Sequence, residues 1–206
     1  MSRKSNTEQR REEIVAALLA VMAEQGYEKA TIQAIAQQAG LAPGLIHYHF
    51  KSKGEILIEL VKSLATLSHA RYLDLAAAAS TPRQKLQAYI DARLAKGPGA
   101  KPEAVAAWVV VGAEAVRQTE VRQVYEEALA FELALLHTLL GDYLNERSKR
   151  SGNVRKLAAG LLAFMEGAFQ LASAAQNVMP KAYAATVAMQ FIDRYIDAEP
   201  DLAGKP

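Results

Sequence analysis

The 206-residue chain is long enough to bury a substantial core as one large or two small domains. Hydrophobic residues make up 51% of it and charged residues 22%, which is an ordinary globular composition. The absence of cysteine excludes a disulfide framework and a thiolate metal site. The sequence has no apolar run of about 18 residues, the length that would predict a membrane span. The polar N-terminus also lacks the pattern of a signal peptide. We therefore expect a cytoplasmic protein that is not attached to a membrane.

The formal net charge is only +2, and the whole positive excess falls within residues 1–53. A local excess of this sign favours contact with a polyanion such as nucleic acid. Arg3 and Lys4 could form an arm that reaches a phosphate or the minor groove. The alternative is a solvated N-terminal tail.

Hydrophobic periodicity predicts an all-α chain of about nine helices. The first is expected from Ser5 or Asn6 to Gly26, a residue that tolerates the left-handed conformation at a helix end. Two short helices follow within residues 31–50. The later helices are expected over residues 52–79, 82–96, 102 onward, 119–144, 154–176 and 180–197, with Gly97-Pro98-Gly99 as a break.

Residues 31–50 carry the most informative pattern. Apolar residues at helical spacing predict a helix that Gly40 can end, and Pro43 can begin a second, short helix. In that second helix, Ile46 and Phe50 can face inward together. This spacing is typical of a helix-turn-helix, whose second helix enters the DNA major groove. The alternative is a two-helix corner of an ordinary helical protein.

The outer side of the second helix suits a nucleic-acid surface because it holds no acidic residue. His47, Tyr48 and His49 can hydrogen-bond phosphates or base edges, and backbone N–H groups at the helix start can meet a phosphate.

A second helix start follows directly. Ser52 and Glu55 form the pattern of a capping box, and Lys51 and Lys53 place cations beside it. These residues suggest a phosphate clamp.

The same region resembles the N-terminal domain of the TetR family of transcriptional regulators, over roughly residues 8–60 and without a gap. The resemblance implies an all-helical homodimer, with a three-helix helix-turn-helix domain at residues 1–53 and a helical ligand-binding and dimerisation domain at residues 54–206. The motifs that carry it are Gly26-Tyr27, Ala30-Thr31-Ile32, Ile35-Ala36, Ala39-Gly40-Leu41, Gly44-Leu45-Ile46, Tyr48-His49-Phe50 and Lys53-Gly54-Glu55-Ile56-Leu57.

The resemblance also implies which residues bind DNA. Ala42 stands where the family usually has a capping Ser or Thr, and Leu45 stands where Thr is frequent. Readout at Leu45 is therefore expected to be apolar, for example toward a thymine methyl group. The expected DNA-binding residues are Thr31, Ala42, Pro43, Gly44, Leu45, His47, Tyr48, His49 and Lys53.

The last two helices are expected to form the dimer interface, as a four-helix bundle about a two-fold axis. Residues 154–176 carry two adjoining apolar stripes, one of which can meet a second copy. The alternative is that both stripes are buried within one chain. The expected interface residues are Gly160, Phe164, Gly167, Leu171, Tyr183, Val187, Phe191 and Tyr195.

Polar groups inside apolar stretches of the C-terminal part suggest a small-molecule site, and carboxylates among aromatic rings could hold a cation. The segment from Ala107 to Gly167 is loosely similar to the C-terminal domain of the choline-sensing BetI-type regulators, but choline is not assigned from that similarity. For each acidic residue the alternative is a solvated or salt-bridged position. The expected pocket residues are Tyr89, Trp108, Val111, Glu114, Tyr125, Phe131, Glu132, His137, Glu166, Phe169 and Gln170.

The sequence therefore predicts a ligand-responsive repressor that binds a palindromic DNA operator as a homodimer and is released by an unidentified small molecule. A helical small-molecule-binding or scaffolding protein without DNA binding is the alternative. An enzyme is not expected because the common catalytic motifs are absent. No cofactor and no metal are expected, since His47 and His49 point apart on a helix.

Overall fold

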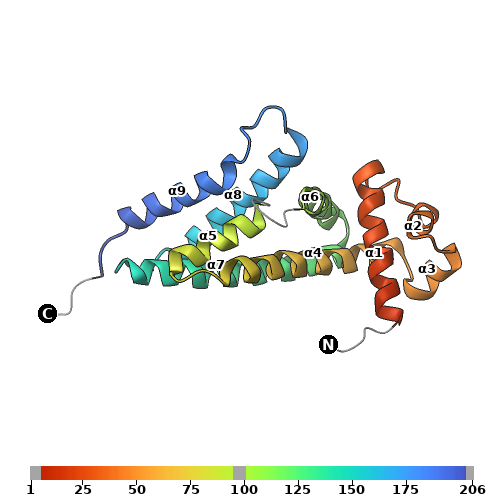
Figure 1. Cartoon of the computed structure of the whole chain (residues 1–206), viewed down its shortest axis with the longest axis horizontal. Coiled ribbons are helices and arrows are strands. Elements are labelled where there is room, and N and C mark those ends of the chain that lie inside the picture. Colours follow the sequence, from red (N-terminus) through yellow and green to blue (C-terminus); the bar gives the residue numbers. More distant parts are fainter. Residues whose placement is uncertain (1–5, 95–100, 203–206) are drawn as a thin grey trace. The chain divides into compact units, whose positions relative to one another are not determined.

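The computed structural model describes residues 6–94 and 101–202. Within these ranges the chain forms helices and no strand beyond one isolated bridge, so the all-α prediction is confirmed (Figure 1). The expected N-terminal arm and the break at residues 97–99 lie outside the described residues. The helices are α1 (Asn6–Gln25), α2 (Ile32–Ala39), α3 (Pro43–His49), α4 (Lys53–Ala76), α5 (Pro82–Arg93), α6 (Pro102–Arg117), α7 (Thr119–Glu146), α8 (Val154–Ala174) and α9 (Tyr183–Ala198).

The helix ends follow from local chemistry. The Thr31 hydroxyl accepts a hydrogen bond from the Ala34 N–H and caps α2, and Gly40 ends α2 in the left-handed conformation at φ 67°. Thr81 and Gln84 form a complete capping box at the start of α5. α9 begins at Tyr183, three residues later than expected, because Ala182 adopts a left-handed conformation (φ 54°) just before it.

The described chain divides into two compact units. The first comprises Met1–Thr66 and Glu103–Ala128, and the second comprises Leu67–Pro102 and Leu129–Pro206. The first unit therefore contains the start of α4, α6 from Glu103 onward and the start of α7, in addition to the three helices of the expected helix-turn-helix domain.

The first unit packs α1, α2 and α3 against one another around a continuous apolar core. Burying each large aliphatic side chain contributes about 1.5–3 kcal/mol, so this core fixes how α3 is rotated about its own axis. The core side chains with no more than 1% exposure include Ile14, Leu18, Ile35, Ile46, Phe50, Ile56 and Leu57.

In the second unit α9 packs on both α5 and α8. The buried residues of this second unit include Tyr89, Ile90, Leu136, Leu140, Met165 and Ile192. Among the described helices, α8 alone has the length and mean hydropathy (1.4) of a membrane span, and core helices of other proteins meet the same criteria. Within the chain, 33% of the apolar window of α8 is buried, and the buried residues include Val154, Leu161 and Met165.

Candidate functional site

The seven-residue helix α3 divides its side chains sharply between core and solvent. Ile46 is 0% exposed, whereas Tyr48 is 78% exposed and Leu45 36%. Gly44 and His47 also lie on the exposed side. The structure thus presents an outward surface of small, apolar and neutral polar groups without a carboxylate, which is a surface that can approach DNA.

The residues that directly precede α2 and α3 differ in their capacity for side-chain hydrogen bonds. Thr31 is exposed and its hydroxyl oxygen already accepts the Ala34 N–H at 3.1 Å. A hydroxyl can accept and donate at once, so the Thr31 O–H can still reach a phosphate. Ala42 provides no side-chain cap for α3.

Lys53 does not simply extend into solvent. Its ammonium donates to the Tyr27 carbonyl at 2.9 Å and to the Glu28 carbonyl at 3.4 Å, and it lies 4.1 Å from the centroid of the Tyr27 ring. An ammonium has three donors, so a phosphate contact would have to share Lys53 with the loop between α1 and α2. Lys51, by contrast, is exposed.

Arg11 of α1 reaches the far end of α3, a contact that sequence reasoning missed. Its guanidinium donates to the His49 carbonyl at 2.6 Å, lies 4.1 Å from the Phe50 ring centroid and pairs with Glu59 of α4 at 3.3 Å. Arginine side chains commonly satisfy the last carbonyls of a helix. A partner 38 residues away along the chain cannot be identified from local spacing.

Part of the predicted ligand site lies in the first unit. The rings of Trp108 and Tyr125 lie 5.0 Å apart, and Val111 is fully buried on the same helix as Trp108. Glu114 is also buried and accepts a hydrogen bond from the Gln118 side chain at 2.8 Å.

The end of α6 also contacts the loop that follows α1. Arg117 pairs with Glu28 at 3.1 Å, but both side chains are largely exposed, at 68% and 81%. Such a pair contributes little stability. Burial raises the pKa of the nearby Tyr27 hydroxyl, and its hydrogen bond with Gln118 opposes that shift.

The other predicted ligand residues gather partly around one buried cation in the second unit. Arg93, which the sequence analysis missed, lies 3.7 Å from Glu132 and 3.0 Å from Glu166. Its guanidinium is 5.1 Å from the Phe169 ring centroid. The Tyr89 hydroxyl donates to Glu132, and burial together with the Glu132 charge raises the pKa of Tyr89 far above its usual value. Two carboxylates, a phenol and an aromatic face thus surround a single guanidinium.

Three predicted pocket residues lie elsewhere on the surface of this unit. Phe131 is 53% exposed and meets the ring of His69 edge-on at 5.0 Å. His137 and Gln170 are exposed on α7 and α8. None of these three contacts the Arg93 cluster through a described interaction.

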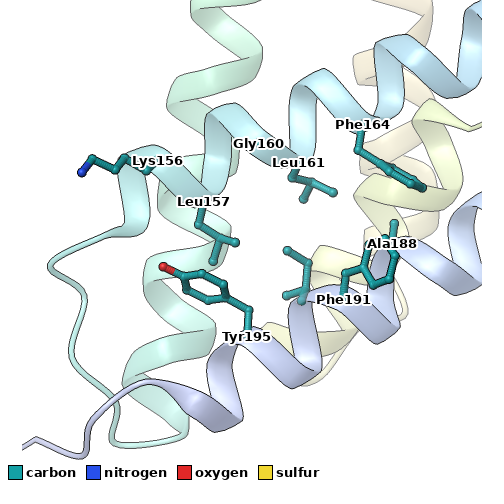
Figure 2. Close-up of a pocket in the computed structure, with 9 residues that line it drawn as sticks. Lys156, Leu157, Gly160, Leu161, Phe164, Ala188, Phe191 and Tyr195 are labelled. Atoms are coloured by element: carbon teal, nitrogen blue, oxygen red, sulfur yellow. The ribbon is translucent and has the colours of Figure 1, made fainter.

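An apolar groove of about 300 Å³ runs between α8 and α9 (Figure 2). Phe164 and Phe191 meet edge to face within it at 5.9 Å, and Phe191 is 58% exposed. The groove also contains four of the predicted interface residues, namely Gly160, Phe164, Phe191 and Tyr195.

Two family models match the chain. Residues 14–60 match the family described as "Bacterial regulatory proteins, tetR family". Residues 82–197 match "BetI-type transcriptional repressor, C-terminal". The second match covers more than half of the chain.

Curated relatives agree with these matches. The HTH-type transcriptional regulator BetI of Rhizobium meliloti is 38% identical over 114 residues, which is 55% of this chain and 56% of that protein. The BetI regulator of Agrobacterium fabrum is 28% identical over 192 residues, covering 93% of this chain and 90% of the relative.

Solved structures share the fold at low sequence identity. A transcriptional regulator from Pseudomonas aeruginosa PAO1 superposes with a TM-score of 0.81 at 18% identity, covering 95% of this chain and 94% of that one. A transcriptional regulator from Saccharomonospora viridis, solved in complex with choline, has a TM-score of 0.76 at 21% identity and covers 93% of this chain and 97% of that one.

Proposed function

Because the chain belongs to the TetR family of transcriptional regulators, we propose that this DNA-binding regulator is a repressor that binds a palindromic operator as a homodimer and is released by a small molecule. The observation that carries the DNA-binding part is the division of α3, which buries Ile46 and exposes Leu45, His47 and Tyr48. We place the protein in the cytoplasm.

The exposed side of α3 determines the kind of readout. Tyr48 and His47 can donate and accept hydrogen bonds at phosphates or base edges, and Leu45 can contact a thymine methyl group. His49 is half-buried and its carbonyl is held by Arg11, so it has less freedom to reach a base. Thr31, which precedes α2, and the exposed Lys51, which follows α3, are suited to contact the phosphate backbone of the DNA.

A single helix of this length reads few base pairs, so two copies are required for specificity. Recognition helices of a dimer read half-sites about 34–36 Å apart, or multiples of that distance. We place the dimer interface at the α8–α9 groove, where Phe191 and Phe164 leave an apolar surface that a second copy can cover. The surface is made of two long helices, as a four-helix bundle between protomers requires.

The Arg93 cluster supports a ligand site in the second unit. Glu132 and Glu166 place two carboxylates beside Arg93, and Tyr89 and Phe169 supply aromatic surface. This chemistry suits a cationic effector that competes with Arg93 for the carboxylates. The choline complex of the Saccharomonospora viridis regulator makes choline one compound to test.

Release from DNA requires that the effector bind the free form more tightly than the DNA-bound form. We propose that the change passes through α4, which contributes residues to both units. Equal operator affinity with and without a bound effector would contradict this coupling.

Selection of bound duplexes from a random DNA pool tests the proposed function. We expect the wild-type protein to enrich an inverted repeat, and its affinity to fall steeply with salt because phosphate contacts release counterions. The matched control is the Tyr48→Ala variant, which removes an exposed side chain from α3 and should enrich the repeat weakly. A wild-type protein that enriches no sequence would overturn the proposal.

A further inference from the structure

Arg11 is held on three sides at the C-terminal end of α3. Its guanidinium donates to the His49 carbonyl at 2.6 Å, lies over the Phe50 ring at 4.1 Å and pairs with Glu59 at 3.3 Å. We propose that Arg11 is a positioning residue for DNA recognition, which fixes the end of α3 relative to α1 and α4 without touching DNA itself. The inference rests on DNA binding by α3.

The shortness of α3 makes such a brace necessary. Isolated helices below about 12–15 residues are marginal in water, and α3 has 7 residues and no side-chain cap at its start. Ile46 in the middle of α3 and Phe50 at its C-terminal end anchor the helix in the core through apolar contacts. The His49 carbonyl lies at the last turn, so the bond from Arg11 adds a directional polar restraint on the tilt of α3.

The planar guanidinium suits this task. It can donate along one edge to the carbonyl, donate along another to Glu59 and present its face to Phe50. Glu59 extends from α4 and Arg11 from α1, so α3 is tied to both neighbouring helices through one side chain. A lysine keeps the charge but cannot provide the planar stack and the fork together.

The charges around Arg11 argue against a phosphate contact. Glu59 lies 3.3 Å and Glu55 4.0 Å from its guanidinium nitrogens. Lys62 also lies 4.0 Å from Glu59, so two cations and two carboxylates balance one another here and the Arg11 charge is already engaged by protein carboxylates rather than left for a DNA phosphate. Arg11 therefore differs from a backbone-binding arginine even though it lies next to the recognition helix.

The experiment compares Arg11→Met with Arg10→Met on the same helix. Arg10 undergoes the same change of charge, but its guanidinium pairs with Glu13 within α1 at 2.6 Å. Affinity is measured across a salt series for a duplex selected by the wild-type protein and for an unrelated duplex, and circular dichroism melting shows that each variant is folded at the assay temperature. Arg11→Lys serves as the conservative variant.

We expect Arg11→Met to weaken binding to the selected duplex by about tenfold, the scale of a lost hydrogen bond to a charged group, and to affect the unrelated duplex much less. The slope of log affinity against log salt should equal that of Arg10→Met, because no phosphate contact is lost. Arg11→Lys should recover part of the loss.

Three results would overturn the inference. A salt slope about one unit shallower for Arg11→Met than for Arg10→Met would make Arg11 a phosphate contact. Equal affinity of folded Arg11→Met and wild-type protein would leave it a purely structural residue. A wild-type protein that selects no duplex would remove DNA binding, and the inference with it, and this outcome is visible before any variant is made.

Discussion

Ile46 and Tyr48 lie two residues apart on α3 but face opposite environments, the core and the solvent. Ile46 is fully buried, whereas Tyr48 is 78% exposed. We expect Ile46→Ala to lower the free energy of unfolding by about 2–5 kcal/mol, because it leaves a cavity in the core. Tyr48→Ala should change it by no more than about 0.5 kcal/mol while weakening binding to the selected duplex. Denaturant unfolding and DNA titration of both variants check this. Equal stability losses would contradict the assigned orientation of α3.

Arg93 is a second residue whose contribution to stability depends on its burial. Its side chain is 5% exposed and that of Glu132 is 4%. Removing one partner of a buried ion pair costs about 3–5 kcal/mol, because the other charge is left buried. We therefore expect Arg93→Met to lower the free energy of unfolding by that amount, measured by denaturant unfolding.

The control for Arg93 is Arg117→Met. Arg117 also pairs with a glutamate, but in an exposed position, and such pairs are worth about 0–1 kcal/mol. A loss of stability for Arg93→Met no larger than that for Arg117→Met would show that the cluster is not a buried charged network.

Single residues also show how far the sequence can be interpreted. The inward position of Ile46 and Phe50 was predicted from their spacing, because helical periodicity relates neighbours on one helix. Arg11 and Arg93 were missed because their partners lie 38 and 73 residues away along the chain. Tertiary packing brings such pairs together, and a local sequence pattern does not indicate which distant residues will meet.

At the scale of elements, a polar contact joins α5, α7 and α9. Arg83 of α5 donates two hydrogen bonds to the Asp193 carboxylate of α9, at 3.0 and 2.6 Å. Tyr143 of α7 donates a third at 2.8 Å. These bonds, with that of Arg83 as the largest cause, lower the pKa of Asp193 below its ordinary value of 3.8.

This shift predicts a pH dependence of stability. A carboxyl with a lower pKa in the folded protein stabilises it above the unfolded pKa, and this stabilisation is lost as the pH falls through the folded pKa. The contribution of Asp193 should therefore be complete at neutral pH and disappear below 3.8. Denaturant unfolding of wild-type and Asp193→Asn proteins between neutral pH and about pH 3 measures it. The difference in stability should shrink on acidification, and a constant difference would contradict the assignment.

Helix starts with a side-chain cap were predicted better than other helix ends. Ser52 caps α4 as predicted, since its hydroxyl accepts the Glu55 N–H at 3.2 Å, whereas the Glu55 carboxylate accepts the N–H of Lys51 rather than that of Ser52. The ends of α4 and α8 come earlier than expected, at Ala76 and Ala174. Apolar periodicity continues past both residues, so sequence alone did not mark where these helices stop.

The predicted ligand site shows the same limit at the scale of the whole chain. Glu132 and Glu166 were expected near aromatic rings, and the structure brings both to Arg93 beside Phe169. His137 and Gln170 were expected in the same site but are exposed. A polar residue in an apolar stretch can face either side of its helix, and only the packing determines which.

At the scale of the whole molecule, the α8–α9 groove determines the expected assembly. Phe191→Asp places a charge on this apolar surface and should convert the proposed homodimer to a monomer at micromolar concentration, as measured by sedimentation equilibrium. The control is Val178→Asp between α8 and α9, which is 82% exposed and lies outside the groove. A wild-type monomer, or a Phe191→Asp variant that still dimerises, would contradict the interface.

The central claim is that two copies of α3 read half-sites on one face of a duplex. It is tested most directly by inserting about five base pairs, half a helical turn, between the halves of the selected inverted repeat and measuring affinity. The two half-sites would then lie on opposite faces, and we predict that binding falls toward that of an unrelated duplex. Unchanged affinity after the insertion would contradict the claim.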